Sequence, residues 1–194
     1  MNTLRAFIAI EMPSPVVEIV RESQQALKRG GIHLRWVRPE NIHLTLRFLG
    51  DISTDAIHGI RAVFWDLAAE TPSFSLQVKG SGVFPGESRP RIVWLGLGGQ
   101  IHMLAALHRR LSSLLGQQGI PAGKRPFRGH LTIGRAKGRV DADRLRLWLG
   151  EMKDVETPPF TVDRICLFKS ELGPGGAVYT PLVRVRTGCG TSIE

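Results

Sequence analysis

The sequence is poor in cysteine and has no long hydrophobic run. Its two cysteines, Cys166 and Cys189, do not form a CxxC pair, so a disulfide framework is not indicated and we expect a reducing compartment. No apolar stretch reaches the roughly 18 residues that a transmembrane helix needs, and no membrane association is expected. The first ten residues are too little apolar for a signal peptide and lack its cleavage site. We therefore expect a cytoplasmic protein.

Acidic residues are also scarce relative to basic ones. There are 17 Asp and Glu against 26 Lys and Arg, which gives a formal net charge of +9. Such a balance favours a polyanionic partner such as a nucleic acid, through long-range attraction. The arginines are spread along the chain rather than gathered in one block, which argues against a disordered basic tail.

Apolar periodicity predicts alternating strands and helices. Strands are expected at 4–10, 34–37, 43–49, 74–78, 91–97, 127–135, 160–168 and 178–185. Helices are expected to begin at Ser14, at Ser53 or Thr54, after Gly98-Gly99 and at Asp141. The glycine- and proline-rich stretch 80–90 is expected to be a loop, and residues 187–194 a frayed tail.

The two halves of the chain repeat the order of strand, helix and a strand with the pattern HxT. Arg5 and Arg91 are 91 − 5 = 86 residues apart, and His43 and His130 are 130 − 43 = 87 apart. This repeat predicts an α+β fold with two pseudo-symmetric lobes, at about 1–90 and 91–186, within one domain spanning 1–194. Each lobe is expected to be an antiparallel sheet with helices packed outside, and strands can exchange between lobes. The motif strands are expected to face a shared central cleft.

The repeated motif pairs a histidine with a threonine two residues later, as His43-Leu44-Thr45-Leu46 and His130-Leu131-Thr132-Ile133. Side chains at i and i+2 of a strand point to the same face. Each copy therefore presents an imidazole and a hydroxyl together, with its aliphatic residues on the buried face. One imidazole can accept a proton while the other donates one, and the hydroxyls can donate hydrogen bonds to a phosphate.

Cationic and aromatic residues flank the motifs. By period two, Arg47 shares the face of His43, and Arg128 that of His130, while Arg135 follows the second motif. Any of the three could supply positive charge to a phosphate. Candidates for stacking on a base are Phe7, Phe48, Phe84 and Tyr179. Among these, strand parity predicts that Phe48 faces the core, and Phe84, in the expected loop, is the stronger candidate.

A wider set of segments accompanies the motifs. They are RAFIAI at 5–10, NIHLTLRFLG at 41–50, GVFP at 82–85, RIVW at 91–94, FRGHLTIGR at 127–135 and YTPL at 179–182. With these segments, nearly the whole chain resembles the two-histidine phosphoesterase superfamily. Within that superfamily it resembles the RNA 2′,3′-cyclic phosphodiesterases, also called 2′-5′ RNA ligases.

The resemblance implies hydrolysis of an RNA 2′,3′-cyclic phosphate to a 2′-phosphomonoester, without a metal or other cofactor. In that reaction His43 is expected to protonate the leaving 3′ oxygen and His130 to deprotonate the attacking water, while Thr45 and Thr132 hold the non-bridging oxygens. Run backwards with an RNA 5′-hydroxyl, the same site would form a 2′-5′ linkage without ATP. The expected partner is RNA with a cyclic-phosphate end, tRNA fragments included, and no obligate protein partner is indicated.

Two alternatives stay open and three classes are disfavoured. The chain has six histidines but no HExxH and no paired CxxC, no GxSxG, and no complete P-loop around Lys124, which argues against a metal enzyme, a serine hydrolase and a P-loop enzyme. A non-catalytic RNA-binding module would keep the positive charge but would have no special use for paired histidines. A related two-histidine enzyme acting on a small cyclic nucleotide would use the same motifs.

Overall fold

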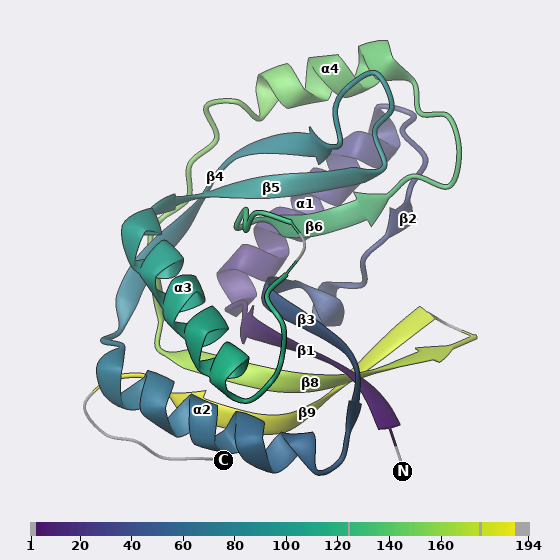
Figure 1. The fold of residues 1–194 in the computed structure, drawn as a ribbon. Helices are drawn as coiled ribbons and strands as arrows, with labels where there is room; N and C mark the ends of the chain where they lie inside the picture. The colour runs from purple at the N-terminus through teal and green to yellow at the C-terminus, as the bar shows by residue number, and fades with distance from the viewer. Residues whose placement is uncertain (1–2, 124, 175, 189–194) are drawn as a thin grey trace.

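The computed structural model describes residues 3–123, 125–174 and 176–188, and its framework is a single nine-stranded antiparallel sheet (Figure 1). Eight strands run in the order β7-β4-β5-β6-β3-β1-β8-β9, and the short β2 pairs with β6. The strands are β1 (Thr3–Glu11), β2 (Arg35–Trp36), β3 (His43–Ser53), β4 (Phe74–Phe84), β5 (Ile92–Gly99), β6 (Leu131–Arg135), β7 (Phe160–Val162), β8 (Arg164–Gly173) and β9 (Gly176–Arg186). The α+β class expected from the sequence is confirmed.

Four α-helices and one short 3₁₀-helix complete the described fold: α1 (Ser14–Arg29), η1 (Pro39–Asn41), α2 (Ala56–Glu70), α3 (Ile101–Gln117) and α4 (Ala142–Glu151). Their ends follow the local sequence. Gly30 and Gly31 stop α1, and Gly31 adopts a φ of 72° that favours glycine. The Asp141 carboxylate accepts hydrogen bonds from the backbone N–H groups of Asp143 and Arg144, which caps α4 as expected.

The helices share one continuous hydrophobic core with one face of the sheet. Ile8 on β1, Leu44 on β3, Leu95 on β5 and Leu131 on β6 are fully buried in this core with Phe64 of α2. The opposite face carries a second, small cluster made of Phe7, Ala9, Cys166 and Phe168. The face of the sheet that the helices cover is called the helix face below. The opposite face, which carries this second cluster, is called the site face.

Strand pairing crosses between the two halves of the sequence. β4, from the first half, pairs with β5, whereas β8, from the second half, pairs with β1 and carries β9 at the sheet edge. Figure 1 shows β8 and β9 beneath β1, far along the chain from their neighbour. The two-lobed organisation therefore includes strand exchange, and we propose that the described residues form one domain because a single core runs under both lobes.

The expected loop at 80–90 is wrong in its first half, because β4 continues through Phe84. Gly80 takes a φ of 67°, and the register to β5 shifts between Val78 and Ser81. This glycine-supported irregularity is a β-bulge, which lets the strand bend and continue. Gly82 is required by packing, since an added Cβ would lie 2.2 Å from the Trp94 ring.

The C-terminal tail is described only to Gly188. Thr187 is buried, and its N–H donates to the Asp163 carbonyl at 2.7 Å, so the chain is still held at this residue. The remainder of the expected tail, residues 189–194 with Cys189, lies outside the described residues.

Candidate active site

The two motif strands lie side by side in the middle of the sheet. Leu44 of β3 pairs with Leu131 of β6, and both side chains are fully buried on the helix face. In this antiparallel register the position across from Thr45 is His130, and the position across from His43 is Thr132. The sheet therefore places two imidazoles and two hydroxyls together on the site face, from segments 87 residues apart in the sequence.

Both imidazoles are held by the same backbone contact. Nδ1 of His43 lies 2.7 Å from the Asn41 carbonyl oxygen, and Nδ1 of His130 lies 2.7 Å from that of Arg128. A carbonyl can only accept, so Nδ1 carries a proton in each ring whether the ring is neutral or charged. The atom that gains or loses a proton is therefore Nε2 in both histidines.

Aromatic side chains pack against each imidazole. The ring centroids of Phe7 and Tyr179 lie 4.8 Å and 5.3 Å from that of His43. Phe84 lies edge-on to His130 at 5.0 Å, and Trp94 is 6.1 Å from the same ring. These contacts restrict the rings to one orientation. The structure places Phe84 and Tyr179 beside the histidines, and stacking of either on a base stays a prediction.

A β-bulge in β3 overturns the expected placement of Arg47 and Phe48. Thr45 pairs with Ala9 and Arg47 with Ile8, so two residues of β3 oppose one of β1 and the alternation of faces slips by one. Arg47 therefore points to the helix face, where it is buried and donates to the Pro121 carbonyl. Phe48 points to the site face, 66% exposed and 6.0 Å from Phe7. The predictions that Arg47 shares the face of His43 and that Phe48 faces the core are wrong.

The second motif carries a bulge at the equivalent place. Trp94 of β5 pairs with Thr132, and Val93 pairs with Gly134, so Ile133 is the extra residue. As a result, Gly134 faces the helix side, where it packs against Leu34. Arg135 then lies on the site face and is exposed. Five residues after each histidine, the site face therefore presents Phe48 in one half and Arg135 in the other.

Arg128 does not lie on the motif strand, because β6 begins only at Leu131. Its carbonyl holds His130, as described above, and its residue is exposed. The structure thus shows a backbone role for Arg128, and contact of its guanidinium with a phosphate stays a prediction.

Burial and positive charge keep both imidazoles neutral near pH 7. Burial lowers the pKa of His43 to about 4, with the contact to Asn41 opposing the shift and the charges of Arg135 and His130 contributing to it. Burial also lowers the pKa of His130, again with Arg135 contributing in the same direction. The charge of Arg135 thus acts on both rings.

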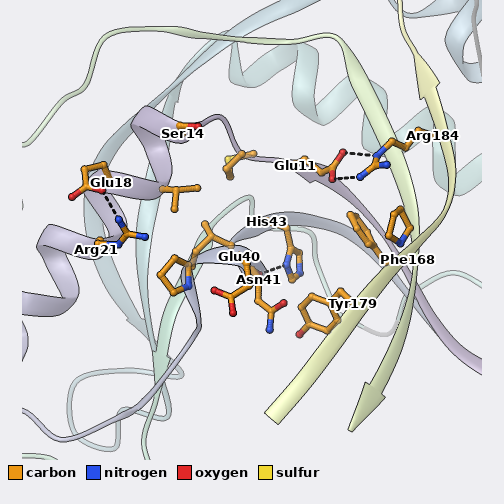
Figure 2. Close-up of a pocket in the computed structure, with 15 residues that line it drawn as sticks. Glu11, Ser14, Glu18, Arg21, Glu40, Asn41, His43, Phe168, Tyr179 and Arg184 are labelled. Atoms are coloured by element: carbon orange, nitrogen blue, oxygen red, sulfur yellow. Dashed lines mark hydrogen bonds and ion pairs between the residues drawn. The ribbon is translucent and has the colours of Figure 1, made fainter. Parts of the chain in front are cut away.

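Asn41 links His43 to the β8–β9 hairpin. Its side-chain Nδ2 donates to the Ala177 carbonyl at 2.8 Å, and the Arg38 guanidinium donates to the same oxygen at 2.5 Å. Asn41 is buried, so this amide has little freedom. Figure 2 shows Asn41 beside His43 and Tyr179, with its carbonyl directed at the imidazole. The carbonyl that orients His43 is therefore anchored by a second strand pair.

A cavity of about 680 Å³ opens beside His43. Its wall combines Tyr179 and Phe168 with the carboxylates of Glu11, Glu18 and Glu40. Glu11 makes a two-pronged ion pair with Arg184 at 2.9 and 3.0 Å (Figure 2). The lining thus combines three carboxylates with two arginines, and the arginines pair with Glu11 and Glu18.

Comparison with known proteins identifies the family of this chain. The model of the "2'-5' RNA ligase superfamily" matches residues 14–174. The chain belongs to this superfamily. It is 34% identical over 182 residues to a Methanothermobacter thermautotrophicus protein named RNA 2′,3′-cyclic phosphodiesterase, an alignment that covers 92% of this chain and 96% of that one.

Solved structures of the 2′-5′ RNA ligase superfamily have the same fold. The protein TT0787 of Thermus thermophilus aligns with a TM-score of 0.79 at 28% identity, covering 96% of this chain and all (100%) of that one. Escherichia coli LigT in its apo form aligns with a TM-score of 0.73 at 26% identity, covering 97% and 99%. The family resemblance identified from the motifs is therefore confirmed.

Two absences within the described residues bear on the expectations. No helix in the described ranges is long and apolar enough to span a bilayer. Within residues 3–123, 125–174 and 176–188, no three His, Cys, Asp or Glu side chains come together as metal ligands.

Sequence reasoning missed two parts of this superfamily site. The sequence presents Asn41 only as part of the extended motif, although an amide two residues before the histidine can orient it through the backbone. It presents Trp94 only as part of a strand, although an aromatic residue on the strand next to the motif strand is a natural support for an imidazole.

Proposed function

We propose that this protein hydrolyses RNA 2′,3′-cyclic phosphate ends to 2′-phosphomonoesters by general acid–base catalysis at His43 and His130. The observation that carries the proposal is the pair of imidazoles, one at the start of β3 and one directly before β6, each with its Nδ1 proton on a backbone carbonyl. This arrangement leaves two Nε2 atoms to exchange protons with one ligand. The activity named for the relatives supports the same reaction.

In the proposed reaction the Nε2 atom of His130 accepts a proton from water, and the water oxygen forms a bond to phosphorus. The bond between phosphorus and the 3′ oxygen breaks, and that oxygen receives the proton of His43 Nε2. The assignment of acid to His43 follows the family resemblance, because the two rings are held alike. The cyclic ester already contains the phosphate and its ring strain, so the step needs no nucleotide cofactor.

A bound phosphodiester supplies the charge that the free site lacks. Because His43 is neutral in the free protein, it must take up a proton to act as an acid. The anionic phosphate raises the pKa of a nearby imidazole and so favours this uptake. Arg135 stabilises the added negative charge of the transition state, and Thr45 and Thr132 donate to the non-bridging oxygens.

Phe48 is proposed to hold the terminal base. Its side chain is 66% exposed on the site face and contacts the ring of Phe7, which in turn packs against His43. An exposed aromatic ring beside a catalytic centre offers a stacking surface that tolerates any base. Phe84 and Tyr179 are proposed to orient the two imidazoles.

The same site is proposed to catalyse the reverse reaction, in which an RNA 5′-hydroxyl replaces water and a 2′-5′ linkage forms. RNA with a cyclic-phosphate end, tRNA fragments included, is the proposed substrate, and the cytoplasm the proposed location. The net charge of +9 supports an RNA substrate, and the scarcity of cysteine supports the cytoplasmic location.

The test is hydrolysis of a defined RNA with a 2′,3′-cyclic phosphate end by the parent and by His43→Ala and His130→Ala. Each variant is expected to lose at least about 10²-fold in kcat with its fold kept, and the product is expected to be the 2′-phosphate. A 3′-phosphate product would reverse the leaving group. Full activity in both variants would eliminate the acid–base mechanism at these histidines, and a parent that binds the RNA without hydrolysing it would be an RNA-binding module.

A further inference from the structure

Three separate segments bring six cations to the outer end of β6. The sequence around β2 supplies Arg35, the turn before β5 supplies Arg89 and Arg91, and the end of β6 with the following loop supplies Arg135, Lys137 and Arg139. The stretches 34–38, 88–93 and 134–140 contain no Asp or Glu. A concentration of one sign of charge at a strand end is the electrostatic footprint of a polyanion site.

Backbone pairing holds these segments together. Arg35 pairs with Arg135 across β2 and β6, and Ile92 pairs with Arg135 across β5 and β6. The N–H of Ala136 donates to the Arg91 carbonyl at 2.9 Å, which fixes the turn against the end of β6. Figure 1 shows the arrowhead of β6 directed towards β2, with the chain continuing from there to α4.

The Arg35 side chain shares the site face with Arg135. Residues paired across antiparallel strands project to the same side of a sheet. Trp36, the next residue, faces the helix side, where it contacts Gly134 and lies 5.2 Å from the Lys28 ammonium. A continuous line therefore runs from the histidine pair through Arg135 to Arg35.

The six cations have no carboxylate partner within the described part of the chain. The ion pairs found there use other basic residues, such as Arg38 with Glu40 and Arg146 with Glu87. All six residues are exposed. Six unpaired positive charges in one place repel one another, and a bound polyanion relieves that repulsion.

We propose that this cationic strip, defined as Arg35, Arg89, Arg91, Lys137 and Arg139 together with Arg135, binds the RNA backbone upstream of the cyclic phosphate. The inference rests on the proposed function and adds the direction in which the substrate leaves the site. The opposite exit, past His43, leads into the cavity whose two arginines, Arg21 and Arg184, are already paired with Glu18 and Glu11, so it offers a phosphate less uncompensated positive charge than the strip.

The strip also predicts which substrates the enzyme prefers. A cyclic mononucleotide reaches only the histidines, Arg135 and Phe48, whereas an oligonucleotide also reaches Arg35 and Arg91. Phosphate contacts with arginine add affinity that does not depend on sequence and that falls with salt. The parent is therefore expected to have a higher kcat/KM for an RNA than for a cyclic mononucleotide.

The experiment compares a cyclic mononucleotide with an RNA about ten nucleotides long, both ending in a 2′,3′-cyclic phosphate. The test variant is R35Q/R91Q, and the matched control is R29Q/R61Q, which removes the same charge from exposed positions on α1 and α2. The readout is the ratio of kcat/KM for the RNA to kcat/KM for the mononucleotide. A ratio cancels any loss of folded protein.

In the test variant this ratio is expected to fall about tenfold at low salt, and the salt slope of log kcat/KM for the RNA to shrink by about 1.4, from about 0.7 for each phosphate contact on a single strand. The control is expected to keep the parent ratio.

An unchanged ratio in the test variant, an equal fall in the control, or a parent with no preference for RNA would overturn the proposal that the strip binds RNA. A fall in R125Q/R128Q instead would overturn it in favour of an exit past His130. Failure of the parent to hydrolyse either substrate would refute the proposed function and not the strip alone.

Discussion

His43 makes the stability of the protein depend on pH in a way that one substitution isolates. The folded protein holds this imidazole neutral, with its pKa lowered to about 4, whereas an unfolded chain protonates histidine at an ordinary pKa of about 6.5. Between about pH 6.5 and pH 4, the imidazole of His43 is protonated in the unfolded state and neutral in the folded state. Acidification therefore favours unfolding, and the effect is complete once the pH falls below the folded-state value.

The size of the effect follows from the two pKa values. Linkage over the interval from about 6.5 to about 4 gives a loss of about 2 kcal/mol in the free energy of unfolding between pH 7 and pH 5, and about 3 kcal/mol by pH 4. In His43→Gln this contribution is absent, because the amide does not titrate. The variant is therefore expected to lose about 2 kcal/mol less than the parent over the same interval.

The assay is urea unfolding at constant ionic strength at pH 7, 6 and 5, for the parent, for H43Q and for H102Q, in which an exposed histidine of α3 is replaced. All other side chains are the same in the three proteins, so the difference between the curves reports the replaced histidine. Parallel curves for the parent and H43Q would refute the claim that burial holds His43 neutral.

Three further results are expected. Phe48→Ala should reduce kcat/KM on a cyclic nucleotide by about 5- to 100-fold, the worth of one base–aromatic stack of about 1–3 kcal/mol, while Phe48→Tyr keeps most of it; equal activity in Phe48→Ala would exclude stacking there. Asn41→Ala, which removes the 2.8 Å bond to Ala177, should destabilise the protein by about 1–2 kcal/mol and lower kcat by more than it changes KM, as steady-state kinetics with thermal melts can show; a change in KM alone would contradict a role in orienting His43. Treatment with a chelator followed by dialysis should leave turnover unchanged, and an inactive product restored by a divalent metal would overturn the metal-free mechanism.

The strands and the approach of the two histidine motifs could be predicted from the sequence because both depend on local pattern. Alternation of polar and apolar residues identified both motif strands, and the repeat joined His43 to His130. The flanking positions failed for one physical reason. Period-two counting assumes an unbroken ladder, and a single extra residue after Thr45 reverses the faces of Arg47 and Phe48 before a second register shift follows between Phe48 and Gly50. No residue type in the sequence marks that bulge.

The Gly80 region failed for a related reason. Glycines and prolines punctuate loops in most sequences, so a glycine-rich stretch predicts the end of a strand. Here Gly80 supports a bulge and Gly82 makes room for the Trp94 ring, so the same residues allow the strand to continue. Only the partner strand decides between the two outcomes, and its identity depends on tertiary pairing.

The matched bulges after Thr45 and Thr132 give the site a direction. The histidine–threonine pairs alone are related by an approximate two-fold, so a small cyclic phosphate would fit them equally well when turned around. Because the bulges bring an aromatic ring to the surface in one half and a guanidinium in the other, the two orientations differ in energy. In the proposed mechanism, this difference would separate the proton donor from the proton acceptor although both histidines are held alike.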